Sequence, residues 1–254
     1  MLKNAIVTPL LKKSGVDVDD LNNYRPFSNT PFLMKTIERI VCPEIHEHLS
    51  FNDLYTKCQS AYRANYSTET AILRVQNDIC CALDRREFTV LVMLDLSAAF
   101  DTVGHKTFLH RLENRFGITG FALAWFKSYL NSRKQTILFN GHSSSTSFDV
   151  LYGVPQGTVL GPLLFTLYSA PVADIIVQHQ LEYMIYSDDT RLYMTCKATA
   201  EARTRIEACV CDIRAWMREN YLVLNDAKTE LMVFESALKV PMTSSPVFRL
   251  VTSQ

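Results

Sequence analysis

The stretch Glu182–Thr195, EYMIYSDDTRLYMT, constrains the fold of this chain more than any other. Two short, apolar, β-prone runs, Glu182–Tyr186 and Arg191–Met194, flank the polar tetrad Ser187–Thr190. Because Asp and Ser fit tight turns and weaken strand interiors, the pattern predicts a β-hairpin with the tetrad as its turn. Two adjacent carboxylates at such a tip repel each other, and water or a divalent cation can lower that cost. An isolated Asp-Asp pair is most often a solvated turn, so its meaning depends on the rest of the chain.

A second carboxylate lies in the run Phe88–Leu96, in which nearly continuous β-branched and apolar residues favour a strand buried on both faces. Asp95 lies near its end, where a lone carboxylate is costly unless it is paired, coordinated or exposed. If this strand lies beside the hairpin, Asp95 approaches Asp188 and Asp189, and such a cluster favours Mg²⁺. Two Mg²⁺ ions about 3.5–4 Å apart can activate a hydroxyl and stabilise a leaving oxygen in phosphoryl transfer.

The loop Gly153–Gly157, with the sequence GVPQG, leads into the apolar stretch Thr158–Ala170, which predicts a helix. Its two glycines let the backbone approach a ligand closely, and Pro162 suits the first turn of the helix. An ordinary strand-to-helix loop explains the same residues, so the loop is informative only together with the three carboxylates.

Apolar spacing predicts further elements along the chain. The helices are Phe32–Leu49, kinked or broken at Pro43, Ser67–Asp84 with Ser67 as N-cap, His105–Phe116, Ala122–Leu130 and Ala202–Met217. The strands are Gln135–Asn140, Ser147–Tyr152, Leu222–Leu224 and Thr229–Phe234. Residues 1–31 show no clear periodicity, and we expect residues 235–254 to fray.

The composition argues against several classes of protein. Lys plus Arg and Asp plus Glu number 26 each, so the chain lacks the basic excess of a free-standing nucleic-acid binder. Its seven cysteines form no CxxC pair and no zinc-ligand spacing with the six histidines, which suits a reducing compartment. Because we find no signal peptide and no apolar run of about 18 residues, we expect an intracellular protein, nuclear or cytoplasmic, without a membrane span.

Several motifs, taken in order, resemble those of one family: Asn23–Pro26 (NYRP), Ser67–Ala71 (STETA), Leu94–Val103 (LDLSAAFDTV), Gly153–Phe165 (GVPQGTVLGPLLF), Tyr186–Tyr193 (YSDDTRLY) and Leu224–Glu230 (LNDAKTE). Over nearly its whole length the chain is similar to the reverse transcriptase domain of non-LTR retrotransposons of the LINE-type, jockey-like kind. The resemblance implies an RNA-directed DNA polymerase, a nucleotidyltransferase that adds dNTPs to a DNA primer on an RNA template.

The resemblance also implies an α+β fold, the right-hand polymerase fold, in which helices back an antiparallel palm sheet. We expect the fingers at roughly 1–87 and 104–152, the palm at roughly 88–103 and 153–235, and a frayed tail at 236–254. The thumb is expected to be missing or truncated, and an endonuclease domain is expected upstream in the complete element.

By resemblance, Asp95, Asp188 and Asp189 are the catalytic carboxylates and the ligands of two Mg²⁺ ions, for which Mn²⁺ can substitute. Lys228 matches the lysine that protonates the pyrophosphate leaving group, which is a general-acid role.

The resemblance assigns the nucleotide site to four other residues. Arg63 would pair with the triphosphate through a charge-assisted fork. Phe100 would exclude a ribose 2′-hydroxyl, the group that distinguishes NTP from dNTP. Gln156 and Gly157 would line the incoming nucleotide.

The chain departs from the family pattern at three places. Ser187 stands where the family usually has Ala, Ala61–Arg63 (AYR) replaces Gly-Phe-Arg, and Gly104-His105 replaces Asp-His.

Two alternatives to an active polymerase remain open. One is a truncated or decayed, non-catalytic remnant with at most weak nucleic-acid binding. The other is an unrelated Mg²⁺-dependent α/β phosphotransferase, which fits the carboxylates but not the combined motifs.

Overall fold

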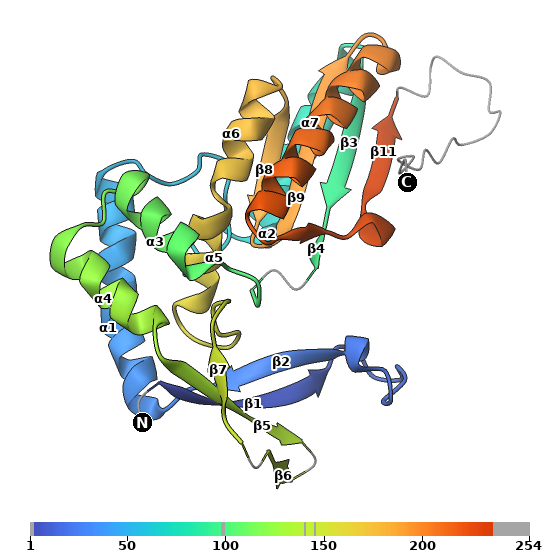
Figure 1. Ribbon diagram of the computed structural model, residues 1–254. Coiled ribbons are helices and arrows are strands. Elements are labelled where there is room, and N and C mark those ends of the chain that lie inside the picture. Colours follow the sequence, from blue (N-terminus) through green and yellow to red (C-terminus); the bar gives the residue numbers. More distant parts are fainter. Residues whose placement is uncertain (1–2, 98–99, 140, 145, 236–254) are drawn as a thin grey trace. The chain divides into compact units, whose positions relative to one another are not determined.

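Residues 3–97, 100–139, 141–144 and 146–235 are described in the computed structural model of this chain (Figure 1). The chain forms two compact units. The first unit combines Met1–Tyr55 with Phe100–Tyr168, and the second combines Thr56–Ala99 with Ser169–Gln254. Each unit therefore joins two separate stretches of the chain around one core. The tail expected at 236–254 lies outside the described residues.

The first unit contains a sheet in the strand order β2-β1-β5-β6, with β7 also paired to β5. β1 runs antiparallel to β2 and parallel to β5. Sequence periodicity missed β1 because only Ala5 and Val7 are buried in it, whereas Leu10 and Leu11 are exposed. The strands are β1 (Asn4–Leu11), β2 (Tyr24–Asn29), β5 (Arg133–Phe139), β6 (His142–Ser143) and β7 (Phe148–Val150).

Helices supply most of the core of the first unit. They are the 3₁₀ turn η1 (Leu21–Asn23), α1 (Phe32–Phe51), α3 (His105–Asn114), α4 (Gly120–Leu130) and most of α5 (Gly161–Ser169). Leu49, Phe108, Leu112, Leu130 and Leu164 are fully buried. The helix expected from Thr158 begins later, at Gly161, because the Thr158 hydroxyl accepts a hydrogen bond from the Gly161 amide at 3.1 Å and ends the preceding loop.

The break expected at Pro43 is wrong, because α1 continues through this residue without interruption. Proline removes one backbone donor and crowds the carbonyl four residues earlier. That carbonyl belongs to Arg39, an exposed residue, so water can hydrogen bond to it. Ile45 and Leu49, both buried, keep the helix packed beyond the proline.

The second unit is built on an antiparallel sheet in the order β11-β3-β9-β8 (Figure 1). The run Phe88–Leu96, expected to form one buried strand, is β3 only as far as Leu94, and Leu96 belongs to β4. β3 lies between β11 and β9, and Val90, Leu91, Val92 and Leu94 are at most 5% exposed. The strands are β3 (Phe88–Leu94), β8 (Glu182–Tyr186), β9 (Asp189–Cys196) and β11 (Glu230–Phe234), and a separate short ladder joins β4 (Leu96–Ser97) to β10 (Val223–Leu224).

Helix α2 (Thr68–Asp84) contacts β3 and β8, and α7 (Thr199–Glu219) contacts β3 and β9. The unit also contains α6 (Pro171–Gln178) and the 3₁₀ turn η2 (Asp226–Lys228). The prediction of Ser67 as N-cap is confirmed, because its hydroxyl accepts from the Thr70 amide while the Thr70 hydroxyl accepts from the Ser67 amide. The apolar stripe predicted for α7 is buried at Ala202, Ile206, Cys209, Val210, Ile213 and Met217.

Within the described residues, one stretch has the length and composition of a membrane-crossing helix. Gly161–Gln178 has a mean hydropathy of 1.2 over 18 residues. The sequence analysis missed this run. The stretch is 67% buried inside the protein and comprises α5 and α6, which Ala170 separates. Burial of this kind is typical of core helices.

Candidate active site

Strand register decides where the Asp-Asp pair lies. β8 and β9 pair from Glu182 opposite Tyr193 to Tyr186 opposite Asp189, so the turn holds only Ser187 and Asp188. The expectation of a four-residue turn is therefore wrong. Thr190 belongs to β9 because it is 6% exposed and pairs with both neighbouring strands, a position that suits a β-branched side chain.

The same register brings Asp95 toward the pair. The last pair between β3 and β9 joins Leu94 to Thr190, so the next residues along the two strands are Asp95 and Asp189. The pKa of Asp189 is raised, first by burial and then by the negative charges of Asp188 and Asp95, while Arg191 and Lys228 oppose the shift. The three predicted carboxylates thus act on one another at one edge of this sheet.

The carboxylates do not form a ready-made cage for an ion. In the described part of the chain, no three His, Cys, Asp or Glu side chains lie close enough together to hold a metal. Asp95 instead forms an ion pair with Lys228, with Nζ and Oδ2 3.0 Å apart, and accepts a hydrogen bond from Asn225 Nδ2 at 3.3 Å. The cationic lysine thus balances a carboxylate that has two like-charged neighbours.

The segment that carries Lys228 is fixed against the strand end that carries Asp95. β10 pairs with β4, and the Asn225 amide donates to the Asp95 carbonyl oxygen at 2.9 Å. At the next residue, where η2 begins, the two Asp226 carboxylate oxygens accept from Arg214 at 2.8 and 3.1 Å. Sequence analysis missed Asn225, although it lies in the same motif as Lys228, because nothing in its local pattern distinguishes an Asp95 partner from a turn residue.

Arg63 lies in the same unit, on a segment that runs beside β8. The Ile185 amide donates to the Cys58 carbonyl at 2.8 Å, and the Ser60 amide donates to the Ile185 carbonyl at 3.0 Å. The Arg63 guanidinium donates to the Gln59 carbonyl at 3.1 Å and lies 4.4 Å from the centre of the Tyr66 ring. Backbone pairing therefore ties this arginine to the strand that enters the carboxylate turn.

Two departures from the family pattern meet in this unit. The hydroxyls of Tyr62 and Ser187 lie 2.8 Å apart and hydrogen bond to each other. Burial raises the pKa of Tyr62, as does the nearby charge of Asp188, while the bond to Ser187 lowers it. Sequence analysis treated the two substitutions separately. Each adds one hydroxyl relative to the usual family residue, and this shared change was the signal that the two side chains could form a hydrogen bond.

The other predicted site residues belong to the first unit. Gln156 Nε2 donates to Asp101 Oδ2 at 3.1 Å, and burial raises the pKa of that carboxyl. The Phe100 ring packs on Phe165, with ring centroids 4.7 Å apart, and the Phe100 carbonyl accepts from the Val154 amide at 2.7 Å. The structure therefore joins Phe100 and the GVPQG loop within one unit.

At two positions of that loop, other atoms of the protein lie so close to the backbone that only glycine fits. Gly153 has φ +86°, and an added Cβ would lie 2.8 Å from the Asp101 carbonyl oxygen. Gly157 has φ +88°, and its Cβ would lie 2.5 Å from the Phe27 ring. The predicted proximity of Gly157 to a nucleotide is not what requires glycine here, because protein atoms already occupy the space.

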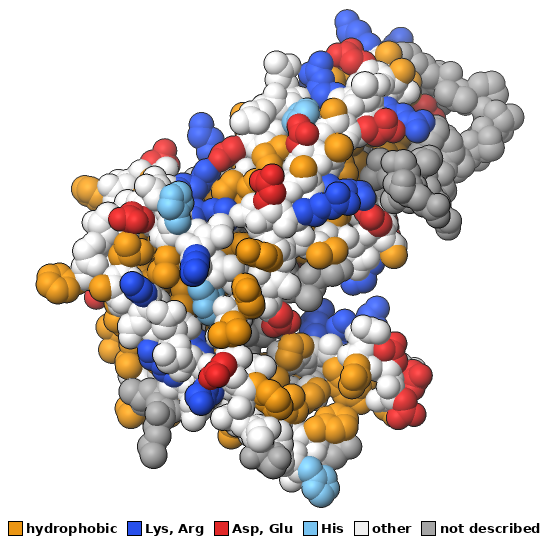
Figure 2. Space-filling model, viewed as in Figure 1, with side chains coloured by type: hydrophobic (Ala, Val, Ile, Leu, Met, Phe, Trp, Pro, Cys, Tyr) orange, Lys and Arg blue, Asp and Glu red, His pale blue; other side chains and the backbone are white. Residues whose placement is uncertain are grey.

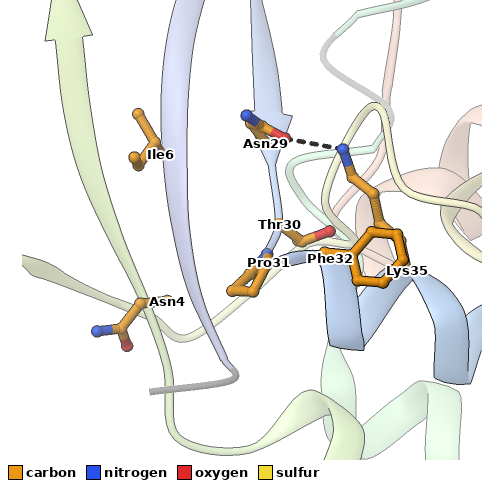
Figure 3. A pocket seen from close by; sticks show the side chains of 7 residues that line it. All are labelled: Asn4, Ile6, Asn29, Thr30, Pro31, Phe32 and Lys35. Atoms are coloured by element: carbon orange, nitrogen blue, oxygen red, sulfur yellow. Dashed lines mark hydrogen bonds between the residues drawn. The ribbon is translucent and has the colours of Figure 1, made fainter.

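A separate hollow of about 390 Å³ lies on the first unit between β1, the end of β2 and the start of α1 (Figure 3). Lys35 Nζ donates to Asn29 Oδ1 at 2.8 Å in its wall. None of the residues predicted for the site lines it. On the face drawn in Figure 2, basic and acidic side chains are interspersed, as the equal totals of 26 each suggest.

Comparison with known proteins gives a consistent result. Residues 11–248 match the family model described as reverse transcriptase (RNA-dependent DNA polymerase). The chain is 28% identical over 238 residues to the probable RNA-directed DNA polymerase from transposon X-element of Drosophila melanogaster, covering 92% of this chain and 26% of the relative. It is 26% identical over 235 residues to the RNA-directed DNA polymerase from mobile element jockey of Drosophila funebris, covering 91% and 25%. The chain thus spans about a quarter of the length of these relatives.

Solved structures share the fold at low sequence identity. Apo telomerase from Candida tropicalis, truncated from the C-terminal domain, superposes with a TM-score of 0.67 at 12% identity, over 95% of this chain and 52% of that chain. The C. tropicalis telomerase in complex with the TWJ fragment of telomeric RNA gives 0.64 at 12% identity, over 93% and 42%. These similarities establish a mixed α and β fold of the reverse transcriptase and telomerase kind.

Proposed function

The chain belongs to the reverse transcriptase (RNA-dependent DNA polymerase) family, and from this premise we propose that it performs RNA-directed DNA synthesis in a non-LTR retrotransposon. Its partners are an RNA template, a DNA primer and dNTPs, and the complete element adds an endonuclease domain. The jockey and X-element polymerases, which match nearly the whole chain, support this reading.

One observation carries the proposal. Burial, and after it the charges of Asp188 and Asp95, raise the pKa of Asp189 at the end of the β3–β9 ladder. Carboxylate oxygens that repel one another are suitable donors for a hard divalent cation, which relieves the repulsion. We assign Asp95, Asp188 and Asp189 as the residues that would hold two Mg²⁺, or Mn²⁺, ions. When bound, such ions activate the attacking hydroxyl and stabilise the leaving oxygen.

The remaining roles follow from position and chemistry. Lys228, held at 3.0 Å from Asp95, supplies a proton to the pyrophosphate leaving group. Arg63 pairs with the nucleotide triphosphate. In the first unit, Phe100 excludes the ribose 2′-hydroxyl, while Gln156 and Gly157 line the nucleotide.

In this proposal the fold is a right hand, with the fingers at roughly 1–87 and 104–152 and the palm at roughly 88–103 and 153–235. The protein acts inside the cell, in the nucleus or the cytoplasm. All seven cysteines are unpaired, which fits a reducing compartment.

Substitution of Asp188 tests the proposal. Asp188→Asn keeps the size of the side chain and removes its charge, so Mg²⁺-dependent extension of a DNA primer on an RNA template should be abolished. Asp212→Asn on α7 is the matched control, because Asp212 is 62% exposed and bonds only to His179 in the described contacts. Low salt is required, since a neutral chain makes few phosphate contacts. Extension that survives Asp188→Asn contradicts the assignment, and a wild type inactive under every condition favours the non-catalytic remnant.

A further inference from the structure

The hydrogen bond between Tyr62 and Ser187 links two segments that are far apart in sequence. Tyr62 directly precedes Arg63, and Ser187 directly precedes Asp188. The two hydroxyl oxygens are 2.8 Å apart, and Ser187 is 8% exposed. The bond therefore joins the neighbour of Arg63, which we propose to bind the nucleotide, to the neighbour of Asp188, which we propose to bind a cation.

Both residues adopt a backbone conformation that side chains other than glycine seldom take. Tyr62 has φ +59° and Ser187 has φ +61°. Residues in this left-handed region persist where the surrounding contacts determine them. The hydrogen bond between the two hydroxyls is a contact that links the two segments while both residues have these conformations.

The pair completes a backbone ladder that already joins the two segments. Gln59 bridges in parallel to Ile185, the Ser60 amide donates to the Ile185 carbonyl, and the Ile185 amide donates to the Cys58 carbonyl. This ladder ends before Arg63 and before the Ser187 turn. Beyond it, the Tyr62–Ser187 bond is the side-chain contact that continues the connection.

We propose that Tyr62 and Ser187 are a positioning pair that locks the Arg63 segment to the carboxylate turn, so that nucleotide affinity depends on both hydroxyls together. The inference rests on the proposed function for its ligand, a deoxynucleoside triphosphate with Mg²⁺. Neither residue touches the reacting atoms in this account. Each acts through its neighbour, Tyr62 on Arg63 and Ser187 on Asp188.

A double-mutant cycle tests the pair. The wild type, Tyr62→Phe, Ser187→Ala and the double variant are titrated with fluorescent N-methylanthraniloyl-dATP and Mg²⁺ on an RNA template with a dideoxy-terminated primer, so no turnover occurs. Each single variant should raise the nucleotide Kd about 3- to 10-fold, the range of a typical hydrogen bond. The double variant should show no more than the larger single effect, because either change already removes the bond.

Ser60→Ala supplies the control. Ser60 is 3% exposed and lies on the same segment as Tyr62, and among the described residues its hydroxyl donates to the Met184 sulfur alone, at 3.5 Å. Its effect on Kd should add to that of Tyr62→Phe. Additive effects of Tyr62→Phe and Ser187→Ala would overturn the proposal, as would lowered unfolding temperatures with an unchanged Kd, which a merely structural bond predicts.

Amide hydrogen exchange separates this inference from the proposed function. Exchange at Ser60 and Ile185 should accelerate in either single variant, whether or not the protein binds a nucleotide. A wild type that extends no primer defeats the proposed function alone. Unchanged exchange at both amides in both single variants defeats the lock alone.

Discussion

The carboxylates of the second unit stand at or next to strand ends, whereas the glycines of the first unit stand in a loop packed against other atoms of the protein. Ladder register fixes Asp95 and Asp189, and their side chains remain open to charged partners such as Lys228. In the first unit, Gly153 leaves no space for a side chain beside Asp101. From this difference we expect substitutions at the charged residues of the second unit to lower activity with little loss of stability. Substitutions in the loop of the first unit should instead lower stability.

The largest effect on folding should come from Gly153→Ala. The left-handed conformation costs alanine about 1–2 kcal/mol, and overpacking against the Asp101 backbone adds about 1–3 kcal/mol, so the free energy of unfolding should fall by at least about 2 kcal/mol. Gly141→Ala is the matched control, because Gly141 has φ +79° and nothing within 4 Å of the added Cβ. It should cost only the conformational part. Equal losses in urea unfolding for the two variants would break the comparison between the units.

Lys228→Gln should show the opposite pattern. A general acid contributes roughly 10²- to 10⁴-fold to the rate, so extension should slow by at least about 10²-fold. The ion pair with Asp95 has a lysine side chain that is 68% exposed, so its loss should change the unfolding free energy by less than about 1 kcal/mol. Single-turnover extension and urea unfolding measure the two quantities. A variant that unfolds easily but extends at the normal rate would reverse the expectation for the second unit.

Phe100→Ala tests whether a first-unit residue also carries chemistry. If its ring excludes the 2′-hydroxyl, preference for dNTP over NTP should fall by roughly tenfold or more, since steric discrimination of this kind is modest. Its ring also packs on Phe165, so the variant should lose stability as well. Primer extension with each nucleotide measures the ratio. A stability loss with an unchanged ratio would identify Phe100 as a packing residue.

The smallest effect concerns pH and the loop of the first unit. Burial lowers the pKa of His105, whose Nε2 hydrogen bonds to the Gly153 carbonyl at 2.8 Å. The unfolded chain therefore takes up a proton at higher pH than the folded chain, and stability falls as pH drops below the ordinary histidine value of about 6.5. His105→Gln should lose less stability than wild type between pH 7 and pH 5. Parallel curves of unfolding free energy against pH would show that His105 does not titrate in this way.

Local patterns were sufficient for the elements with strong periodicity. The β3 run and the α7 stripe were predicted and are confirmed, because burial follows directly from residue order in both. The Ser67 N-cap is confirmed as well, because its hydrogen bonds involve only residues three positions apart. Local patterns were insufficient where burial is partial. β1 alternates over only half its length, and the α1 helix passes Pro43 because an exposed carbonyl can hydrogen bond to water.

The sequence by itself determined which groups are present, namely three carboxylates, a lysine and a glycine-rich loop, and that residues 11–248 match the reverse transcriptase family. Only the tertiary structure decided which of these groups meet. Strand pairing places Leu94 opposite Thr190. Side-chain contacts join Lys228 and Asn225 to Asp95, and the hydroxyl of Tyr62 to that of Ser187. Contacts between residues distant in sequence depend on register and backbone pairing, which no local pattern encodes.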